Sequence, residues 1–354
     1  MYYSETEARK LVAEAGRKLL EKELVARTWG NISARISGDS FVITPSGKAY
    51  EGLTEDDMVK VSIDDCSWEG DMKPSSEMGV HADAYALRPD VNFVIHTHQY
   101  YASAVAAECR STQFAPCGAY GLPGSGKLRN NMKACVSENP DKKTFLMARH
   151  GALILGSDPD EAFGLANVLE EDCRTLVEAR VPSHDVSPKA EFDTSAVSIK
   201  ALPYVVVARD PYIMECCKAG VSVPSYTDDF AQIVGPDISV ADNDPWAVQR
   251  ILLGYNTNPA AKRAPKIPMT GVLDRMGGQQ PALNSMIGRN AVLVRGVGAV
   301  CAGRTESDAE AIAMITSKNC AAACYVRHAR PLGAIDSWLQ RLIYLSRYSK
   351  RIDG

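Results

Sequence analysis

The stretch NFVIHTHQYY, residues 92–101, places two histidines two positions apart within an apolar run. Successive side chains of a strand point to opposite faces, so His96 and His98 would share one face. Two neighbouring imidazoles favour a divalent metal ion, although a pair of hydrogen-bonded structural histidines has the same pattern. The chain has only six histidines, and the rest of the sequence must distinguish these alternatives.

A third histidine, His150, precedes Gly151 in the apolar stretch KTFLMARHGALILG, residues 143–156. This stretch predicts one long strand with His150 near its middle. Three imidazoles and an open position are typical of a catalytic divalent metal site. Neutral imidazole binds Zn²⁺ and also other divalent metals such as Mn²⁺, Co²⁺ or Fe²⁺, so the residues leave the metal open.

The predicted element directly before the histidine strand carries a carboxylate. The stretch PSSEMGVHADAYALRPD, residues 74–90, predicts a helix that starts at Pro74 and the serines and ends before Pro89. Glu77 and His81 would share a face of it. Glu77 has three alternative roles: general base, displaceable fourth metal ligand, or a glutamate stabilised by the helix dipole. His81 is expected to be a structural partner.

Three turns upstream of the histidines combine glycine with small polar side chains: TWGNIS at 28–33, TPSG at 44–47 and PSSE at 74–77. Backbone N–H groups and hydroxyls at such turns bind phosphate well. Each turn alone is a weak signal, because such turns are common. Together they favour a phosphate-bearing substrate.

The elements that must position these residues alternate between helix and strand. Ser4 and Glu7 have capping-box spacing at the start of the first helix, and Asp158 followed by Pro159 predicts the start of another. Alternation of this kind predicts layered α/β packing.

The motif order GNIS, ITPSG, PSSE, HTH and RHGAL spans the first 180 residues and resembles the class II aldolase/adducin family, in particular its L-fuculose-1-phosphate aldolase-like members. The resemblance implies a three-layer α/β/α domain with a central, mainly antiparallel sheet. It implies zinc ligands at His96, His98 and His150. It also implies phosphate contacts from Thr28, Gly30, Asn31, Ser46, Gly47, Ser75 and Ser76. The acidic residue after the two serines is usually glutamate in the family's aldolases. The resemblance therefore implies aldolase chemistry, and it implies that Glu77 is the catalytic base.

Two positions depart from the family pattern. Trp29 stands in a phosphate turn where a small residue is usual. Cys117 stands where the fuculose-type aldolases have a tyrosine, supplied by the next subunit as proton donor. Tyr120 and Tyr226 are the alternatives that the sequence offers.

Length and composition indicate the number of domains, the kinds of partner and the cellular location. A chain of 354 residues predicts about two domains. The net charge of −4 gives no general attraction to nucleic acid or to anionic membranes. Ten cysteines without a CxxC pair, a polar N-terminus and no membrane-length apolar run predict a cytoplasmic protein. We expect a homo-oligomer, a dimer or tetramer, that binds a small-molecule sugar phosphate.

The second half of the sequence echoes the first. YVVVARDPY at 204–212 is similar to FVIHTHQYY at 93–101. VRGVGAVCAG at 294–303 is likewise similar to MARHGALILG at 147–156. In these alignments Val207 and Arg209 replace His96 and His98, and Val297 replaces His150. Chance similarity is one interpretation. We favour a truncated, degenerate second copy at 199–354 that lacks metal ligands, joined by a linker at 182–198 to a metal-binding catalytic domain at 1–181.

Together these patterns predict a divalent-metal-dependent aldolase that cleaves a sugar phosphate or related polyol through a metal-stabilised enediolate. The alternatives within the family are a metal-dependent epimerase, dehydratase or decarboxylase. A more distant alternative is a non-enzymatic, adducin-like scaffold, which the degenerate second half would also fit.

Overall fold

The structure is a computed structural model that describes residues 2–22, 24–25, 29–181, 186–218, 222–253 and 288–345. The chain divides into two compact units. The first unit comprises Met1–Pro182, Tyr226–Asp229 and Ala321–Arg330. The second comprises Ser183–Ser225, Phe230–Cys320 and Pro331–Gly354. Residues 182–185 of the predicted linker lie outside the described residues.

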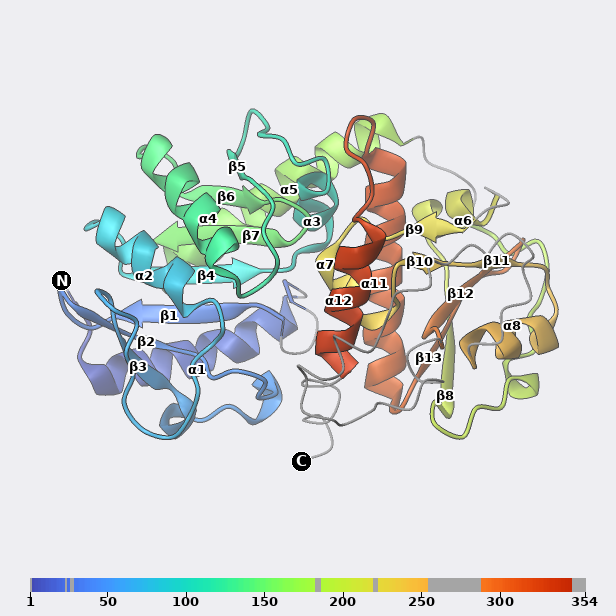
Figure 1. Cartoon of the computed structure of the whole chain (residues 1–354), viewed down its shortest axis with the longest axis horizontal. Helices are drawn as coiled ribbons and strands as arrows, with labels where there is room; N and C mark the ends of the chain where they lie inside the picture. Colours follow the sequence, from blue (N-terminus) through green and yellow to red (C-terminus); the bar gives the residue numbers. More distant parts are fainter. Residues whose placement is uncertain are drawn as a thin grey trace. The chain divides into compact units, whose positions relative to one another are not determined.

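The first unit is built on a seven-stranded sheet with the order β3-β2-β1-β4-β7-β6-β5 (Figure 1). Its strands are β1 Asn31–Arg35, β2 Ser40–Ile43, β3 Val59–Ser62, β4 Phe93–Thr97, β5 Cys117–Gly118, β6 Thr144–Met147 and β7 Gly151–Gly156. Every neighbouring pair is antiparallel except β5 and β6, which are parallel. The sheet is therefore mainly antiparallel, as predicted.

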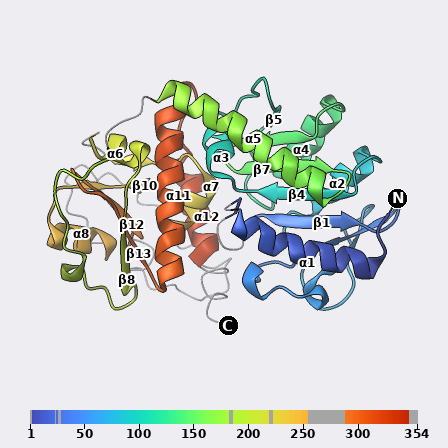
Figure 2. The ribbon, with the colours of Figure 1, turned by 180° about the vertical axis from the view of Figure 1, so that it is seen from behind.

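Five helices cover this sheet: α1 Glu5–Glu21, α2 Met78–Leu87, α3 Tyr100–Ala106, α4 Gly126–Glu138 and α5 Pro159–Arg180. Helices α2 and α4 cover one face, whereas α1, α3 and α5 cover the other (Figures 1 and 2). Two short 3-10 helices, Tyr50–Gly52 and Glu55–Asp57, precede β3. The first unit is thus a three-layer α/β/α domain, which confirms the predicted fold class.

Local signals account for where two of these helices begin. The Ser4 side chain accepts the N–H of Glu7 at the start of α1. The Asp158 side chain accepts the N–H of Glu161 at the start of α5, with Pro159 as its first residue. Each such cap contributes about 1 kcal/mol, because it satisfies a backbone donor that the helix leaves unpaired.

Two predicted boundaries are wrong. The helix expected from Pro74 begins at Met78. The single strand expected over 143–156 is two strands, β6 and β7, with His150 in the turn between them. Arg149 has a φ of 65° in that turn, a left-handed conformation that ends a strand. A run of apolar residues does not reveal such a turn, because both strands are buried on both faces.

The second unit contains a four-stranded sheet with the order β11-β12-β13-β8. Its strands are β8 Tyr204–Ala208, β11 Val240–Ala241, β12 Ala291–Val294 and β13 Gly298–Gly303. A separate two-stranded sheet pairs β9 Val223–Pro224 with β10 Asp237–Ile238. The remaining elements among the described residues of the second half are η3 Thr194–Ala196, α6 Pro211–Lys218, α7 Asp228–Ile233, α8 Pro245–Leu252, α11 Glu306–Tyr325 and α12 Ala334–Ile343.

The four-stranded sheet has the same strand directions and register as four strands of the first unit. β8-β13-β12-β11 pair antiparallel, antiparallel and parallel, as do β4-β7-β6-β5. Val207 lies opposite Val300 in β13, just as His96 lies opposite Leu153 in β7. Val207 therefore occupies the register position that the sequence alignment assigned to it.

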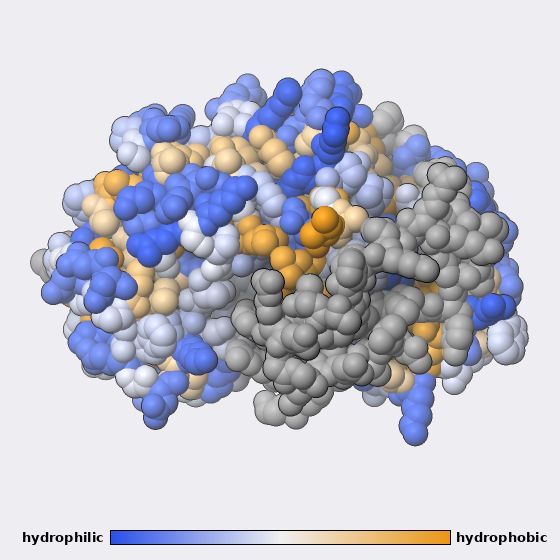
Figure 3. Space-filling model, viewed as in Figure 1, coloured by the Kyte–Doolittle hydropathy of each residue, from blue (hydrophilic) through white to orange (hydrophobic). Residues whose placement is uncertain are grey.

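The surface seen in Figure 3 consists mainly of hydrophilic residues where it is coloured. Among the helices in the described part of the chain, none combines the length and apolar character needed to cross a bilayer.

Candidate metal centre

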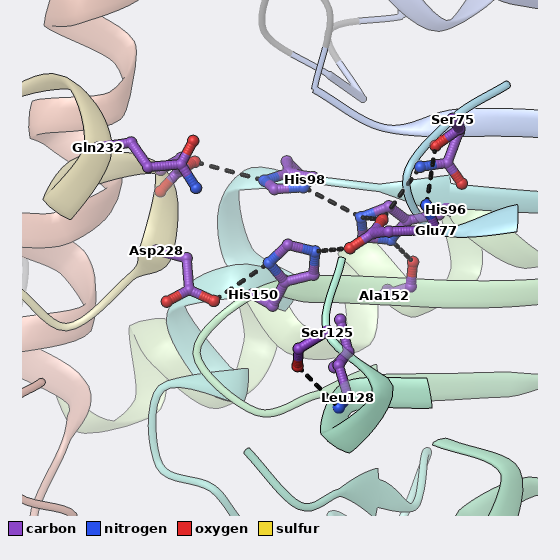
Figure 4. Close-up of polar contacts among 12 residues, drawn as sticks. Ser75, Glu77, His96, His98, Ser125, Leu128, His150, Ala152, Asp228 and Gln232 are labelled. Carbon is purple, nitrogen blue, oxygen red and sulfur yellow. Dashed lines mark hydrogen bonds and ion pairs between the residues drawn. The ribbon is translucent and has the colours of Figure 1, made fainter. Parts of the chain in front are cut away.

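The three predicted histidines meet at one end of the central strands (Figure 4). His96 is on β4, His98 is one residue beyond that strand, and His150 is in the β6–β7 turn. One ring nitrogen of each lies within 4.8 Å of the others, and all three side chains are buried. The Nε2 atoms of His96 and His98 are 3.0 Å apart.

A close backbone approach brings His150 to this place. Thr97 pairs with Ala152 across β4 and β7, next to Gly151. A Cβ atom at Gly151 would lie 2.1 Å from the carbonyl oxygen of Thr97. Only glycine fits there, so the pairing of β4 with β7 requires Gly151.

Hydrogen bonds fix the orientation of two of the imidazoles. The Nδ1 of His96 lies 2.9 Å from the carbonyl oxygen of Ala152. A carbonyl only accepts, so Nδ1 carries the proton and the Nε2 lone pair of neutral His96 faces the cluster. The Nδ1 of His150 lies 3.2 Å from Asp228 Oδ2, so its Nε2 faces the cluster.

Glu77 reaches into the cluster from the N-cap position of α2. Its Oε1 is 3.0 Å from His150 Nε2 and its Oε2 is 3.2 Å from His96 Nε2. Its side chain makes no capping hydrogen bond, although Ser75 Oγ accepts the backbone N–H of Glu77 at 3.3 Å. The carboxylate is thus directed at the histidines and away from the helix end.

A buried chain of hydrogen bonds supports Glu77 from behind. Asn31 Nδ2 donates to Glu77 Oε2 at 3.0 Å, and Asn31 Oδ1 accepts from His81 Nε2. The other nitrogen of His81 is 2.7 Å from Ser33 Oγ, which contacts the hydroxyl of Tyr85 at 2.8 Å. His81 therefore lies behind the site and orients the amide of Asn31 toward Glu77.

Burial and neighbouring charges set the protonation of the site. Burial raises the pKa of Glu77, but the imidazoles of His96 and His150 outweigh it and hold that pKa well below its usual range. Burial lowers the pKa of His150, but Glu77 and Asp228 outweigh it and raise the pKa to about 10. Burial lowers the pKa of His98 to about 3 and, with His96 nearby, that of His81 to about 3. The metal-free site is thus a charged His150 between two carboxylates.

This donor set fits a divalent metal ion. Ligand bonds of about 2.0–2.2 Å at tetrahedral angles place donor atoms roughly 3.3 Å apart. The separations of 3.0 Å between His96 and His98 and 3.2 Å between His96 and Glu77 are close to that value. The carbonyl of Ala152 and the carboxylate of Asp228 hold two of the imidazoles from behind, as partners of metal-binding histidines commonly do.

Two of the three predicted phosphate turns are joined by backbone hydrogen bonds, and one of the two contains Glu77. Ser46 N–H donates to Lys73 O at 2.9 Å, and Ser75 N–H donates to Thr44 O at 3.0 Å. The TPSG and PSSE turns therefore lie side by side, with Ser46 half-buried, Ser75 buried and Ser76 exposed.

Glycines allow two of these turns. Gly30 and Gly47 have φ values of 115° and 76°, which side chains disfavour. The amide of Asn31 is engaged with Glu77 and His81. Thr28 lies outside the described residues.

The structure also bears on the missing tyrosine. Cys117 is on β5, and burial raises the pKa of its thiol. The hydroxyl of Tyr120 lies 3.4 Å from Asp228 Oδ1. Tyr120 thus contacts a carboxylate that contacts His150, whereas Cys117 donates to the backbone oxygen of Gly118 at 3.6 Å.

Sequence reasoning missed Asp228 and Asp229, which stand in the sequence YTDD at 226–229. Both are fully buried. Asp229 Oδ2 is 3.7 Å from His98 Nδ1. Two adjacent acidic residues in a short polar stretch are the only local signal, and they are more often exposed to solvent.

The chain is similar to known proteins. The family model described as "Class II Aldolase and Adducin N-terminal domain" matches residues 10–177. A 5-methylthioribulose-1-phosphate/5-deoxyribulose-1-phosphate aldolase of Escherichia coli O45:K1 (strain S88 / ExPEC) is 32% identical over 209 residues, 56% of this chain and 95% of the relative. An L-fuculose phosphate aldolase of Methanococcus maripaludis (strain C7) is 30% identical over 170 residues, 43% and 87% of the two chains. A solved L-fuculose 1-phosphate aldolase is 26% identical, with a TM-score of 0.46 over 50% of this chain and 88% of that one.

Proposed function

Because the chain belongs to the class II aldolase and adducin N-terminal domain family, we propose that it is a divalent-metal-dependent aldolase, a carbon–carbon lyase, that cleaves a sugar phosphate or a related polyol. The observation that carries the proposal is the buried group of His96, His98 and His150 with the carboxylate of Glu77 among them. A scaffold has no need to bury four such groups facing one another.

The three histidines would hold the metal through their Nε2 atoms, with Glu77 beside them. Zinc is our first choice, because imidazole and carboxylate donors at these separations suit it, and Mn²⁺, Co²⁺ and Fe²⁺ are the alternatives. When bound, the cation would act as a Lewis acid that stabilises the enediolate left by carbon–carbon cleavage.

Glu77 is the proposed base that moves a proton on the three-carbon fragment. Its pKa, held below the usual range, keeps it ionised, which is the form that accepts a proton. The amide of Asn31 holds one carboxylate oxygen at 3.0 Å, so the group is oriented before substrate binds. A carboxylate that only stabilised the helix would instead bond to the backbone N–H groups of α2, and Glu77 makes no such bond.

The turns next to the metal centre would hold the substrate phosphate. The proposed contacts are Thr28, Gly30, Asn31, Ser46, Gly47, Ser75 and Ser76. Support comes from the antiparallel bridge between Pro45 and Pro74, which joins the TPSG and PSSE turns. Phosphate held there would orient the substrate without touching the bond that breaks.

Tyr120 is the proposed proton donor in place of the tyrosine missing at position 117. Its hydroxyl contacts Asp228, which contacts His150, so it lies at the edge of the metal centre. The thiol of Cys117 is a poorer candidate, because burial disfavours its ionised form.

The domain organisation remains part of the proposal: a catalytic domain at 1–181, a linker at 182–198 and a degenerate copy at 199–354. The matching register of β8 with β13 and β4 with β7 supports the copy. We further propose a cytoplasmic homo-oligomer. All ten cysteines are free, which suits a reducing compartment, and a mass measurement in solution tests the oligomer.

The test of the proposed function is a metal analysis of the purified chain followed by a screen of phosphorylated ketoses. We expect bound divalent metal and release of dihydroxyacetone phosphate from at least one ketose 1-phosphate, with both lost on treatment with a chelator. Bound metal with epimerisation, dehydration or carbon dioxide release would move the chain to another reaction of the family. A chain that binds no divalent metal would contradict every enzymatic version of the proposal.

A further inference from the structure

The segment Tyr226–Asp229 belongs to the first unit although it comes from far beyond the family match at 10–177. It is attached at the residue next to a proposed metal ligand. The backbone N–H of Asp228 donates to Arg149 O at 2.8 Å, and the Oδ2 of the same residue lies 3.2 Å from His150 Nδ1. Figure 4 shows the carboxylate of Asp228 beside the ring of His150.

This segment belongs to a connection that is longer in the second half of the chain than in the first. Ten residues, 107–116, separate α3 from β5. Twenty-one residues, 219–239, separate the corresponding elements α6 and β11. The second half lacks histidines at the ligand positions. Its longer connection nevertheless contains Asp228 and Asp229, the two buried carboxylates next to the three histidines.

We propose that Asp228 is a positioning residue for the metal centre, which orients His150 and strengthens it as a ligand. The inference rests on the proposed function, since it presumes a metal held by Nε2 of His150. A carboxylate cannot donate, so it accepts the Nδ1 proton and leaves Nε2 for the metal. Because Asp228 is fully buried, little water competes for this hydrogen bond.

Asp229 would have the same role for His98, at a longer distance. Its Oδ2 is 3.7 Å from His98 Nδ1, and its Oδ1 accepts the hydroxyl of Thr227 at 2.6 Å. Two adjacent residues of one segment thus face the outer nitrogens of two ligands. His96 differs, because its outer nitrogen donates to the neutral carbonyl of Ala152.

The experiment measures the affinity of the full chain for Co²⁺ by its visible absorption, in competition with a chelator. Asp228→Asn keeps the size of the side chain and removes its charge, and we expect it to weaken Co²⁺ binding by about 10- to 100-fold. The control is Asp83→Asn, which removes another buried carboxylate of the first unit, one that pairs with Arg129. We expect the control to bind Co²⁺ as the wild type does.

A second measurement needs no variant. In the zinc-loaded wild type, nitrogen NMR of His150 should show a protonated Nδ1 protected from solvent and a metal-bound Nε2. Co²⁺ affinity of folded Asp228→Asn within twofold of the wild type would overturn the role of Asp228 and leave the aldolase proposal intact. A protonated Nε2 in the zinc-loaded protein would overturn both that role and the assignment of His150 as a metal ligand. A wild-type chain without metal affinity would overturn both.

Discussion

Replacing Glu77 with glutamine separates a catalytic base from a residue that only stabilises a helix. Glutamine retains the shape of the side chain, and its carbonyl oxygen can still accept from Asn31 Nδ2, now 3.0 Å from the carboxylate. Since Glu77 makes no capping bond to α2, we expect Glu77→Gln to change the contribution of that helix to the free energy of unfolding by at most about 1 kcal/mol.

The expected effect on chemistry is much larger. Glutamine cannot accept a proton, so turnover should fall by roughly 10²- to 10⁴-fold, equivalent to about 3–5 kcal/mol in the activation barrier. The assay is the exchange of substrate-derived protons with deuterated solvent on the metal-loaded variant. Exchange follows the proton transfer itself and does not depend on product release.

The matched control is Glu161→Gln. Glu161 is in the first turn of α5 and accepts the backbone N–H of Ser157 at 2.7 Å. It therefore has the helix-stabilising role that is the alternative to catalysis for Glu77. We expect this variant to lose some stability and to exchange protons at the wild-type rate. Wild-type exchange in metal-loaded Glu77→Gln would refute the base, and loss of metal as the first effect would make Glu77 a ligand.

Three further predictions concern the metal. His98→Ala should lose metal and turnover together on dialysis and metal analysis, because two imidazoles hold a divalent ion poorly, and a fully active variant would contradict the ligand set. Metal analysis should give about one ion per chain, since Val207, Arg209 and Val297 replace the histidines in the second half; two ions would contradict the degenerate copy. The pKa of His150 is raised to about 10 in the metal-free protein, so binding must release its Nε2 proton below that pH. Co²⁺ affinity should therefore rise by about tenfold per pH unit between pH 7 and 9, and a flat profile would show that no proton is released.

The fold class and the histidines that meet in the site could be predicted from the sequence. The signals were local: two histidines two positions apart in an apolar run, a third histidine before a glycine, and turns with glycine and hydroxyl residues upstream. Such patterns can be recognised from the sequence because they involve residues that are close together in the chain. The close approach of Gly151 to Thr97 explains the glycine after His150, because a side chain at position 151 would prevent β4 and β7 from pairing. The alternation of helices and strands predicts layered α/β packing, whereas the three-layer α/β/α arrangement was implied by the family resemblance.

The residues that complete the site are visible only in the folded protein. The turn at Arg149 moves His150 out of its predicted strand, and a buried chain through Asn31 and His81 aims Glu77 at the imidazoles. Asp228 and His150 are 78 positions apart in the chain, so no periodicity links them. Contacts of this kind arise only when packing closes the long loop between their ends. The spacing of residues encodes which face a side chain takes, whereas the partner it meets there depends on the whole fold.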